Sequence, residues 1–122
     1  MKKKPSFKLL NTGTYPYDIL FTIGTTTEEI QNYIKKNFKY DLDNDEVERI
    51  TMTGVGRAAQ LKNKAFVLWV KTDDVPVIAH EVFHIVEMLM ITIECPLNDS
   101  TSEPYAYLTE YIWRQIIGCI KK

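Results

Sequence analysis

The chain has too few cysteines and too short apolar runs for several classes of protein. Its two cysteines, Cys95 and Cys119, do not make a disulfide framework of the kind that supports small secreted domains, so we interpret both as free thiols. The longest uninterrupted apolar stretch, residues 65–70, is far shorter than the roughly 20 residues of a membrane-spanning helix. The basic residues 2–4 are followed by a segment too short and too interrupted for the apolar core of a signal peptide. These absences predict a cytoplasmic protein with no membrane segment.

A strong charge of one sign is also absent. The basic and acidic residues number 15 and 16, and the resulting net charge of −1 gives the whole chain no electrostatic footprint for nucleic acid. We find no internal repeat and no low-complexity linker. Hydrophobic residues make up 45% of the 122 residues, which is enough for one core. The sequence therefore predicts a single domain spanning residues 1–122.

The first half of the sequence predicts a strand, a helix and an acidic turn. Residues 15–23 are rich in aromatic and β-branched residues, which predicts a strand. Two overlapping S/T-x-x-E capping boxes in residues 25–29 precede apolar residues at helical spacing, which predicts a helix over residues 28–38. Residues 41–46 have the aspartate spacing of a calcium loop, but the sixth position is not glycine and the twelfth, Met52, has no carboxylate. We therefore expect a solvated turn there.

The second half predicts a β-hairpin followed by two helices. Residues 47–60 alternate in character, Gly54 and Gly56 indicate a bulge or bend, and the apolar residues 65–70 should form a central strand. Asp74 and Pro76 mark the start of a helix that should run to about residue 93. Ser102 can cap a last helix that begins at residue 103 or 104. The predicted fold class is α+β, with a small antiparallel sheet packed on helices.

The chain has only two histidines, and they lie on either side of a short segment that begins with glutamate: His-Glu-Val-Phe-His, residues 80–84. Residues four apart lie on one face of a helix, so the imidazoles of His80 and His84 can reach the same cation. Glu81 lies about a quarter of a turn away, close enough to act on a water molecule at the metal without binding the metal itself. The H-E-x-x-H pattern therefore predicts a zinc site in which Glu81 is the general base and acid.

A firmly held zinc ion with one position open to water needs a third protein ligand, and the chain has no third histidine. Glu87 lies on the same helical face, but ligands from three successive turns of a straight helix converge poorly on a tetrahedral ion. Glu87 could instead accept a hydrogen bond from a ligating histidine. Glu103 could approach from the next helix, although an acidic residue at a helix N-terminus is also favoured by the helix dipole. We expect Glu103 to complete the site, with Glu87 and Cys95 as alternatives.

This set of residues resembles the gluzincin branch of zinc metallopeptidases, in which a glutamate on the helix after H-E-x-x-H is the third ligand. The resemblance implies that one zinc ion is held by His80, His84 and Glu103, with Glu81 as the catalytic residue. Residues 102–108, Ser-Glu-Pro-Tyr-Ala-Tyr-Leu, are also similar to the E-x-x-A-Y-L segment of small zincin-like proteins of phages and prophages. The likeness covers about residues 64–117, with an upstream strand similar to the edge strand of zincins. It implies a single zincin-like metallopeptidase domain that hydrolyses peptide bonds in a peptide or protein substrate.

The sequence departs from the gluzincin pattern in two ways. Gluzincins usually have an aspartate four residues after the third-ligand glutamate, and this chain has Tyr107 there. They also usually stabilise the oxyanion with a residue from a further lobe, for which this chain is too short. Tyr105, Tyr107 or Tyr111 could donate instead, or could pack in the core. The alternative function is a non-catalytic, zincin-like metal-binding module that acts as a partner-binding or regulatory protein, and a second alternative is a metal-free helical scaffold.

Overall fold

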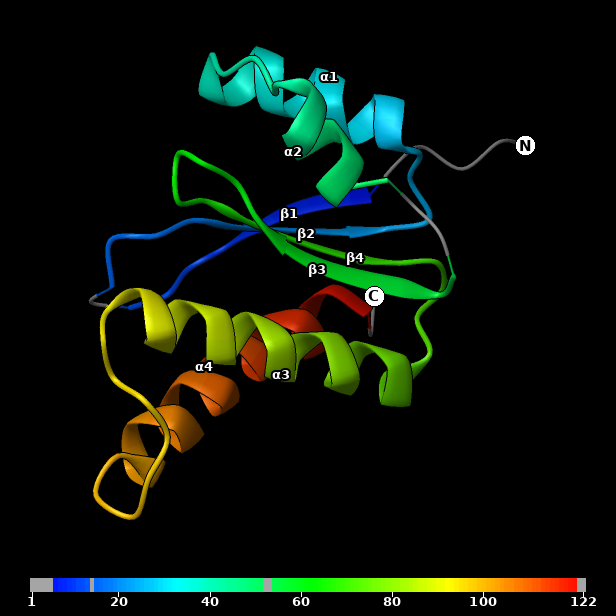
Figure 1. The fold of residues 1–122 in the computed structure, drawn as a ribbon. Coiled ribbons are helices and arrows are strands. Elements are labelled where there is room, and N and C mark those ends of the chain that lie inside the picture. The colour runs from blue at the N-terminus through cyan, green and yellow to red at the C-terminus, as the bar shows by residue number, and fades with distance from the viewer. Residues whose placement is uncertain (1–5, 14, 52–53, 121–122) are drawn as a thin grey trace.

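The computed structural model describes residues 6–13, 15–51 and 54–120. A four-stranded sheet lies between two layers of helices, with α1 and α2 on one face and α3 and α4 on the other (Figure 1). The α+β class is the one that the sequence predicted. In chain order the elements are β1 (Ser6–Leu10), β2 (Ile19–Ile23), α1 (Thr27–Phe38), α2 (Asn44–Arg49), β3 (Gly56–Gln60), β4 (Phe66–Val70), α3 (Val75–Thr92) and α4 (Ser102–Ile120).

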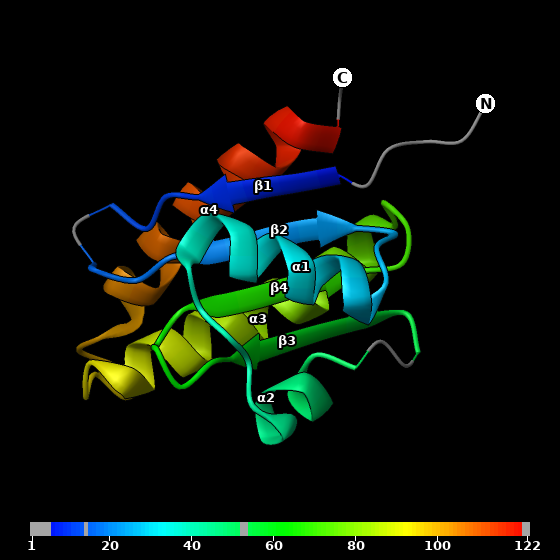
Figure 2. The same ribbon diagram turned by 90° about the horizontal axis from the view of Figure 1, so that it is seen from above.

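The sheet is mixed, which corrects the prediction of an antiparallel sheet. Its strand order is β1-β2-β4-β3 (Figure 2). β1 pairs antiparallel with β2, and β3 pairs antiparallel with β4, but the neighbours β2 and β4 run parallel. The parallel pair arises because α1 and α2 carry the chain over one face of the sheet before the β3–β4 hairpin returns it beside β2. The predicted hairpin is confirmed, with β3 shorter than expected and at the edge of the sheet.

Strand β4 is buried along its whole length, as predicted for a central strand. Its side chains alternate between two apolar clusters, as the two-residue period of a strand requires. Phe66, Leu68 and Val70 join the cluster formed with α3 and α4. Val67 and Trp69 join the cluster on the α1 face. Both helical layers therefore depend on this one strand.

Helix α2 and strand β1 were not predicted. α2 replaces the solvated turn expected at residues 41–46 and the first residues of the strand expected at 47–60; of that strand, residues 52–53 lie outside the described part. A capping box starts α2, because the Asp43 side chain accepts a hydrogen bond from the Glu46 N–H and the Glu46 carboxylate accepts one from the Asp43 N–H. The helix predicted over residues 28–38 is confirmed, with Thr26 and Glu29 forming its capping box.

Helix α3 is the principal helix beneath the sheet. By length and composition it is apolar enough to cross a membrane, although the sequence predicted no membrane segment. It also has seven buried residues and packs against β3, β4 and α4. α3 lies between the sheet and α4, which explains why the helix face formed by its buried residues is apolar.

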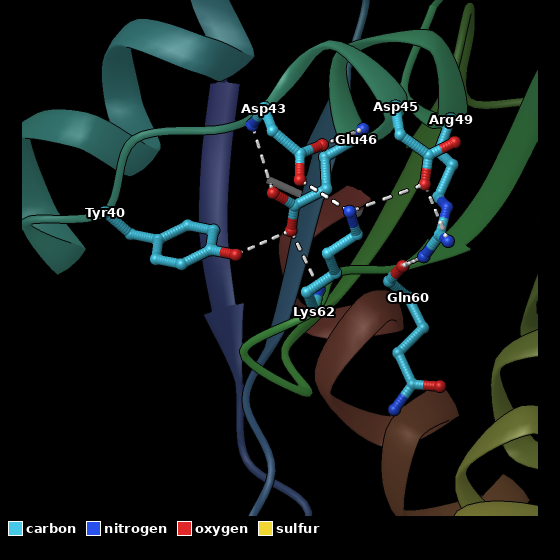
Figure 3. Close-up of polar contacts among 7 residues, drawn as sticks. All are labelled: Tyr40, Asp43, Asp45, Glu46, Arg49, Gln60 and Lys62. Atoms are coloured by element: carbon cyan, nitrogen blue, oxygen red, sulfur yellow. Dashed lines mark hydrogen bonds and ion pairs between the residues drawn. The ribbon is translucent and has the colours of Figure 1, made fainter.

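Polar contacts around a buried carboxylate join α2 to the hairpin (Figure 3). Glu46 is only 1% exposed. Its carboxylate accepts hydrogen bonds of 2.7 Å from both the Tyr40 hydroxyl and the Lys62 backbone N–H. The Lys62 ammonium lies 2.6 Å from the Asp43 carboxylate. Because Lys62 lies in the turn between β3 and β4, these contacts hold α2 beside the end of β3.

The same contacts make stability depend on pH. Burial alone would raise the pKa of the Glu46 carboxyl, but hydrogen bonds from the Lys62 N–H, the Tyr40 hydroxyl and the Asp43 N–H lower that pKa below its ordinary value. A lowered carboxyl pKa stabilises the fold above the ordinary pKa, and this stabilisation is lost as the pH falls through the folded-state value. The hydrogen bond to Glu46 raises the pKa of Tyr40 from 10.0 to about 12. That contribution is complete below pH 10.0 and is lost as the pH rises towards 12.

We expect Glu46→Gln to lower the free energy of unfolding by about 1–3 kcal/mol at neutral pH, because an amide group replaces a buried, hydrogen-bonded anion. The difference from wild type should shrink as the pH falls below the ordinary glutamate pKa of 4.5. Glu48→Gln, at an exposed position on the same helix, is the matched control. Chemical denaturation at several pH values checks this, and equal stability of the two variants at neutral pH would contradict it.

Candidate metal centre

The imidazole rings of the two histidines lie close together on α3. Nε2 of His80 lies 3.2 Å from Nε2 of His84, a distance at which one ring can also donate a hydrogen bond to the other. Two nitrogen ligands that bind one zinc ion at about 2.0–2.1 Å in tetrahedral geometry are themselves roughly 3.3 Å apart. The side chains on α3 therefore have the separation that a shared ion requires.

Glu87 approaches His84 from the other side of the imidazole ring. Its Oε1 lies 3.8 Å from Nδ1 of His84, not beside Nε2. This distance is longer than a hydrogen bond, and a small movement of the carboxylate would let it accept one from Nδ1 while Nε2 binds a metal ion. This position fits a carboxylate that orients the histidine, which is one of the two roles considered from the sequence.

Glu81 is buried against the first residue of β3. Its side chain is 8% exposed. A Cβ atom at Gly56 would lie 2.9 Å from both Cγ and Oε2 of Glu81, and 3.0 Å from Cγ1 of Val77. Only glycine therefore fits this close approach without displacement of a neighbour. Within the described part of the chain, no hydrogen bond or ion pair engages the Glu81 carboxylate, so it is available to a water molecule or a substrate.

An open groove runs between α3 and the edge strand. Its volume is about 470 Å³. The lining residues come from α2, β3 and α3: Arg49, Gly56, Arg57, Ala58, Ala59, Gln60, His80, Glu81, His84 and Met88. The histidine pair and Glu81 thus share one wall of the groove, and the opposite wall is the edge of the sheet.

Within the described part of the chain, strand β3 has backbone groups along this groove that pair with no other strand. The hydrogen bonds at the two ends of the hairpin and the register of β3 with β4 show that the odd-numbered residues of β3 direct their backbone groups at β4. Gly56, Ala58 and Gln60 consequently direct theirs to the open edge. Arg49 occupies one end of this edge, since its Nη1 donates a hydrogen bond of 3.1 Å to the Gln60 carbonyl. The groups of Gly56 and Ala58 are left for an extended ligand.

Glu103 does not lie with the histidines in this structure. It is exposed in the first turn of α4, on the side opposite the buried residues Tyr105, Leu108, Ile112 and Ile116. α4 packs against α3 and β1, whereas the histidines line the groove beside β3. Among residues 6–13, 15–51 and 54–120, no three His, Cys, Asp or Glu side chains are grouped closely enough to hold a metal ion. Ligation by Glu103 stays a prediction, and it requires the start of α4 to turn towards the groove.

The tyrosines considered as oxyanion donors do not line the groove. Tyr105 is buried, and its hydroxyl donates a hydrogen bond of 2.8 Å to the Cys95 carbonyl. Tyr107 and Tyr111 are exposed and line a separate hollow with Tyr15. Tyr105 therefore has the core role that the sequence left open, and all three hydroxyl groups are outside the groove.

Three groove residues had no catalytic or binding role in the sequence analysis. Gly56 was expected only to bend a strand, and Arg49 and Arg57 belong to no motif. A Gly-Arg pair at the start of an edge strand is the available signal. Its meaning depends on contacts with α3 and α2, which the local sequence does not specify.

We expect Gly56→Ala to lower stability by about 1–3 kcal/mol and to displace the Glu81 side chain, because the added methyl group overlaps Cγ and Oε2. Gly118→Ala is the matched control, since a Cβ atom at Gly118 has nothing within 4 Å and alanine favours the helix. Thermal unfolding of the two variants checks this. A Gly56→Ala variant as stable as Gly118→Ala would contradict the close approach of α3 to β3.

The chain matches no protein-family model, and no curated protein or solved structure is significantly similar to it. The zincin-like fold implied by the motif therefore stays a prediction. The function proposed next depends on the geometry of the groove and on the motif itself.

Proposed function

We propose that the protein is a zinc-dependent peptide hydrolase, in which His80 and His84 hold the ion and Glu81 is the general base and acid. The observation that carries the proposal is the 3.2 Å separation of the two Nε2 atoms. It is supported by the position of Glu81, which lies in the same groove, is buried against β3 and has no protein partner among the described residues. This combination supplies two ligands and a free carboxylate beside a surface that can bind a peptide.

The chemistry divides between the ion and the side chains. When bound, zinc would polarise the carbonyl of the scissile bond and make water more acidic. Glu81 accepts a proton from the attacking water while the new carbon–oxygen bond forms. It then gives the proton to the leaving nitrogen as the carbon–nitrogen bond breaks. Because Glu81 packs against Gly56, its carboxylate keeps a fixed place relative to any ligand bound along β3.

The proposed substrate is an extended peptide that pairs with the open edge of β3. Main-chain hydrogen bonds to Gly56 and Ala58 would hold it, as in other cases of strand addition. Arg49 donates a hydrogen bond to the Gln60 carbonyl, so a peptide can pair only with the part of β3 nearest Glu81. The peptide would therefore lie in the groove that His80 and His84 line.

A non-catalytic metal-binding module is the second candidate. Two large apolar side chains on α3 are exposed: Phe83, within the motif, is 53% exposed, and Ile91, about two turns further along, is 60% exposed. In the non-catalytic function, a partner protein that packs on α3 would bury them. In this function the protein binds zinc and a partner, and Glu81 has no proton to transfer.

Protein purified without chelator should carry about one zinc ion per chain, and His80→Ala should lose it. Glu81→Gln should keep the zinc and lose cleavage of a peptide library, because an amide cannot act as the general base. Elemental analysis and mass spectrometry of the peptide products check both. Zinc below about half an equivalent in the wild type would contradict the metal site. Equal cleavage by wild type and Glu81→Gln would contradict the role of Glu81, whereas zinc without any cleavage would favour the non-catalytic module.

The third ligand is proposed to be Glu103, on the strength of the motif resemblance, with Glu87 orienting His84. On this proposal Glu103→Gln should weaken zinc binding by more than about 100-fold, and Glu87→Gln by about 10- to 100-fold. Glu110→Gln removes a carboxylate from the exposed face of the same helix as Glu103 and is the matched control. Competition with a zinc-binding dye measures all three affinities. A Glu103→Gln variant that binds zinc as tightly as Glu110→Gln would exclude Glu103 as a ligand.

A further inference from the structure

Two arginines and one carboxylate are among the described residues that line the groove beside the histidines: Arg49, Arg57 and Glu81. Arg49 already has partners: its Nη2 lies 2.9 Å from Asp45, and its Nη1 bonds the Gln60 carbonyl (Figure 3). A zinc ion would add further positive charge. The groove is therefore suited to an anionic ligand.

Arg57 is held by the protein at one atom only. Its Nε donates a hydrogen bond of 2.6 Å to the backbone carbonyl of Arg49. Within the described residues, neither Nη atom has a partner and no carboxylate pairs with this guanidinium. The side chain is half-buried, so part of the desolvation cost of an ion pair has been met in the folded protein. An arginine anchored through Nε with both Nη groups free is suited to a carboxylate, which can accept two N–H bonds.

The register of β3 fixes the position of Arg57 relative to Glu81. Arg57 follows Gly56, which packs against Glu81. When a strand pairs with β3, side chains that lie opposite one another share a face of the sheet, with Cβ atoms about 4.5–5.5 Å apart. A peptide residue opposite Arg57 is therefore next in sequence to the residue opposite Gly56, which lies at the general base. A carboxylate at that position would lie with Arg57 on the α2 face of the sheet, opposite the face that packs on Glu81, and would come within reach of the free Nη atoms.

We propose that the groove selects acidic peptides, and that Arg57 binds a carboxylate within about two residues of the cleaved bond. Cleavage of the bound peptide rests on the hydrolase function proposed above, but recognition of the carboxylate by Arg57 does not. The carboxylate belongs either to an Asp or Glu side chain or to the C-terminus of the peptide. A side-chain carboxylate gives an enzyme that cuts within acidic segments, and a terminal one gives an enzyme that trims chain ends.

Binding by the zinc-loaded Glu81→Gln variant tests this without turnover. The probes are fluorescent mixtures of peptides with both termini blocked, randomised except for one central position fixed as Glu, Gln or Lys. A further Gln mixture has a free C-terminal carboxylate. The Glu mixture should bind about three- to tenfold more tightly than the Gln mixture, as expected for a partly exposed charge pair. Tighter binding of the unblocked Gln mixture instead assigns the carboxylate to the chain end.

Substitutions in the same background identify the arginine responsible. Arg57→Gln should remove the preference, Arg57→Lys should keep part of it, and Arg57→Glu should favour the Lys mixture. Arg114→Gln, which removes the same charge from the exposed face of α4, should leave the preference unchanged. The Arg57→Glu result supports the proposal independently of Arg57→Gln, because a preference that changes sign does not come from misfolding.

The outcomes separate this proposal from the hydrolase function. If wild type cleaves peptides but the Glu and both Gln mixtures bind equally, the hydrolase function stands and selection by Arg57 is overturned. If wild type cleaves nothing and the acidic preference depends on Arg57, selection stands and the hydrolase function is contradicted. Failure of every mixture to bind also overturns selection. A preference that persists in Arg57→Gln assigns it to another cation and overturns the role of Arg57.

Discussion

The close contact between Gly56 and Glu81 is the constraint on which the candidate site depends. Two histidines at helical spacing converge wherever the helix lies, but they form a site only when something else lines the same space. Because Gly56 has no side chain, α3 packs directly against the backbone of the edge strand. That approach buries Glu81 and places the histidines and the open edge of β3 in the lining of one groove. A larger residue at this position would separate α3 from the strand edge that is proposed to bind substrate.

Local sequence was sufficient where local interactions decide the structure. The capping box of α1, the proline near the start of α3 and the apolar run of β4 each specify an element through neighbours in the chain. α2 was missed because it is short and polar, and because Asp43, which caps it, was interpreted as part of a turn. The mixed sheet was missed because the pairing of β2 with β4 is decided by how two distant segments pack. No periodicity within either strand encodes that choice.

The candidate site shows the same division. The separation of the His80 and His84 nitrogens follows from spacing on one helix, so the sequence predicted it. The orientation of Glu103 depends on how the loop after α3 turns into α4, and spacing alone gives no rotation for that helix. The contacts of Gly56 and Arg57 involve elements far apart in the chain. Residues whose role is created by tertiary packing carry no motif, which is why the two arginines of the groove had no assigned role.

Polar contacts between α2 and the β3–β4 hairpin hold the two arginines of the groove in place. The buried Glu46 carboxylate joins α2 to the turn of the hairpin, and α2 in turn positions Arg49 at the strand edge. Arg57 then bonds the backbone of Arg49. The charged wall of the groove therefore rests on a hydrogen-bonded anion remote from the histidines. A substitution at Glu46 would change the position of α2, and it would alter the groove through Arg49, which α2 contributes to the lining.

The position of Arg49 also bears on the behaviour of the protein in concentrated solution. Open sheet edges are templates for other chains, and self-association through them leads to aggregates and fibrils. Arg49 donates a hydrogen bond to the Gln60 carbonyl and so places a charged group at one end of the strand edge. Fewer backbone groups of β3 are then open to pairing with a strand of a second copy. A short, single peptide can still be accommodated beside Gly56 and Ala58. The same side chain thus reduces the number of strand groups through which two copies of the chain could pair.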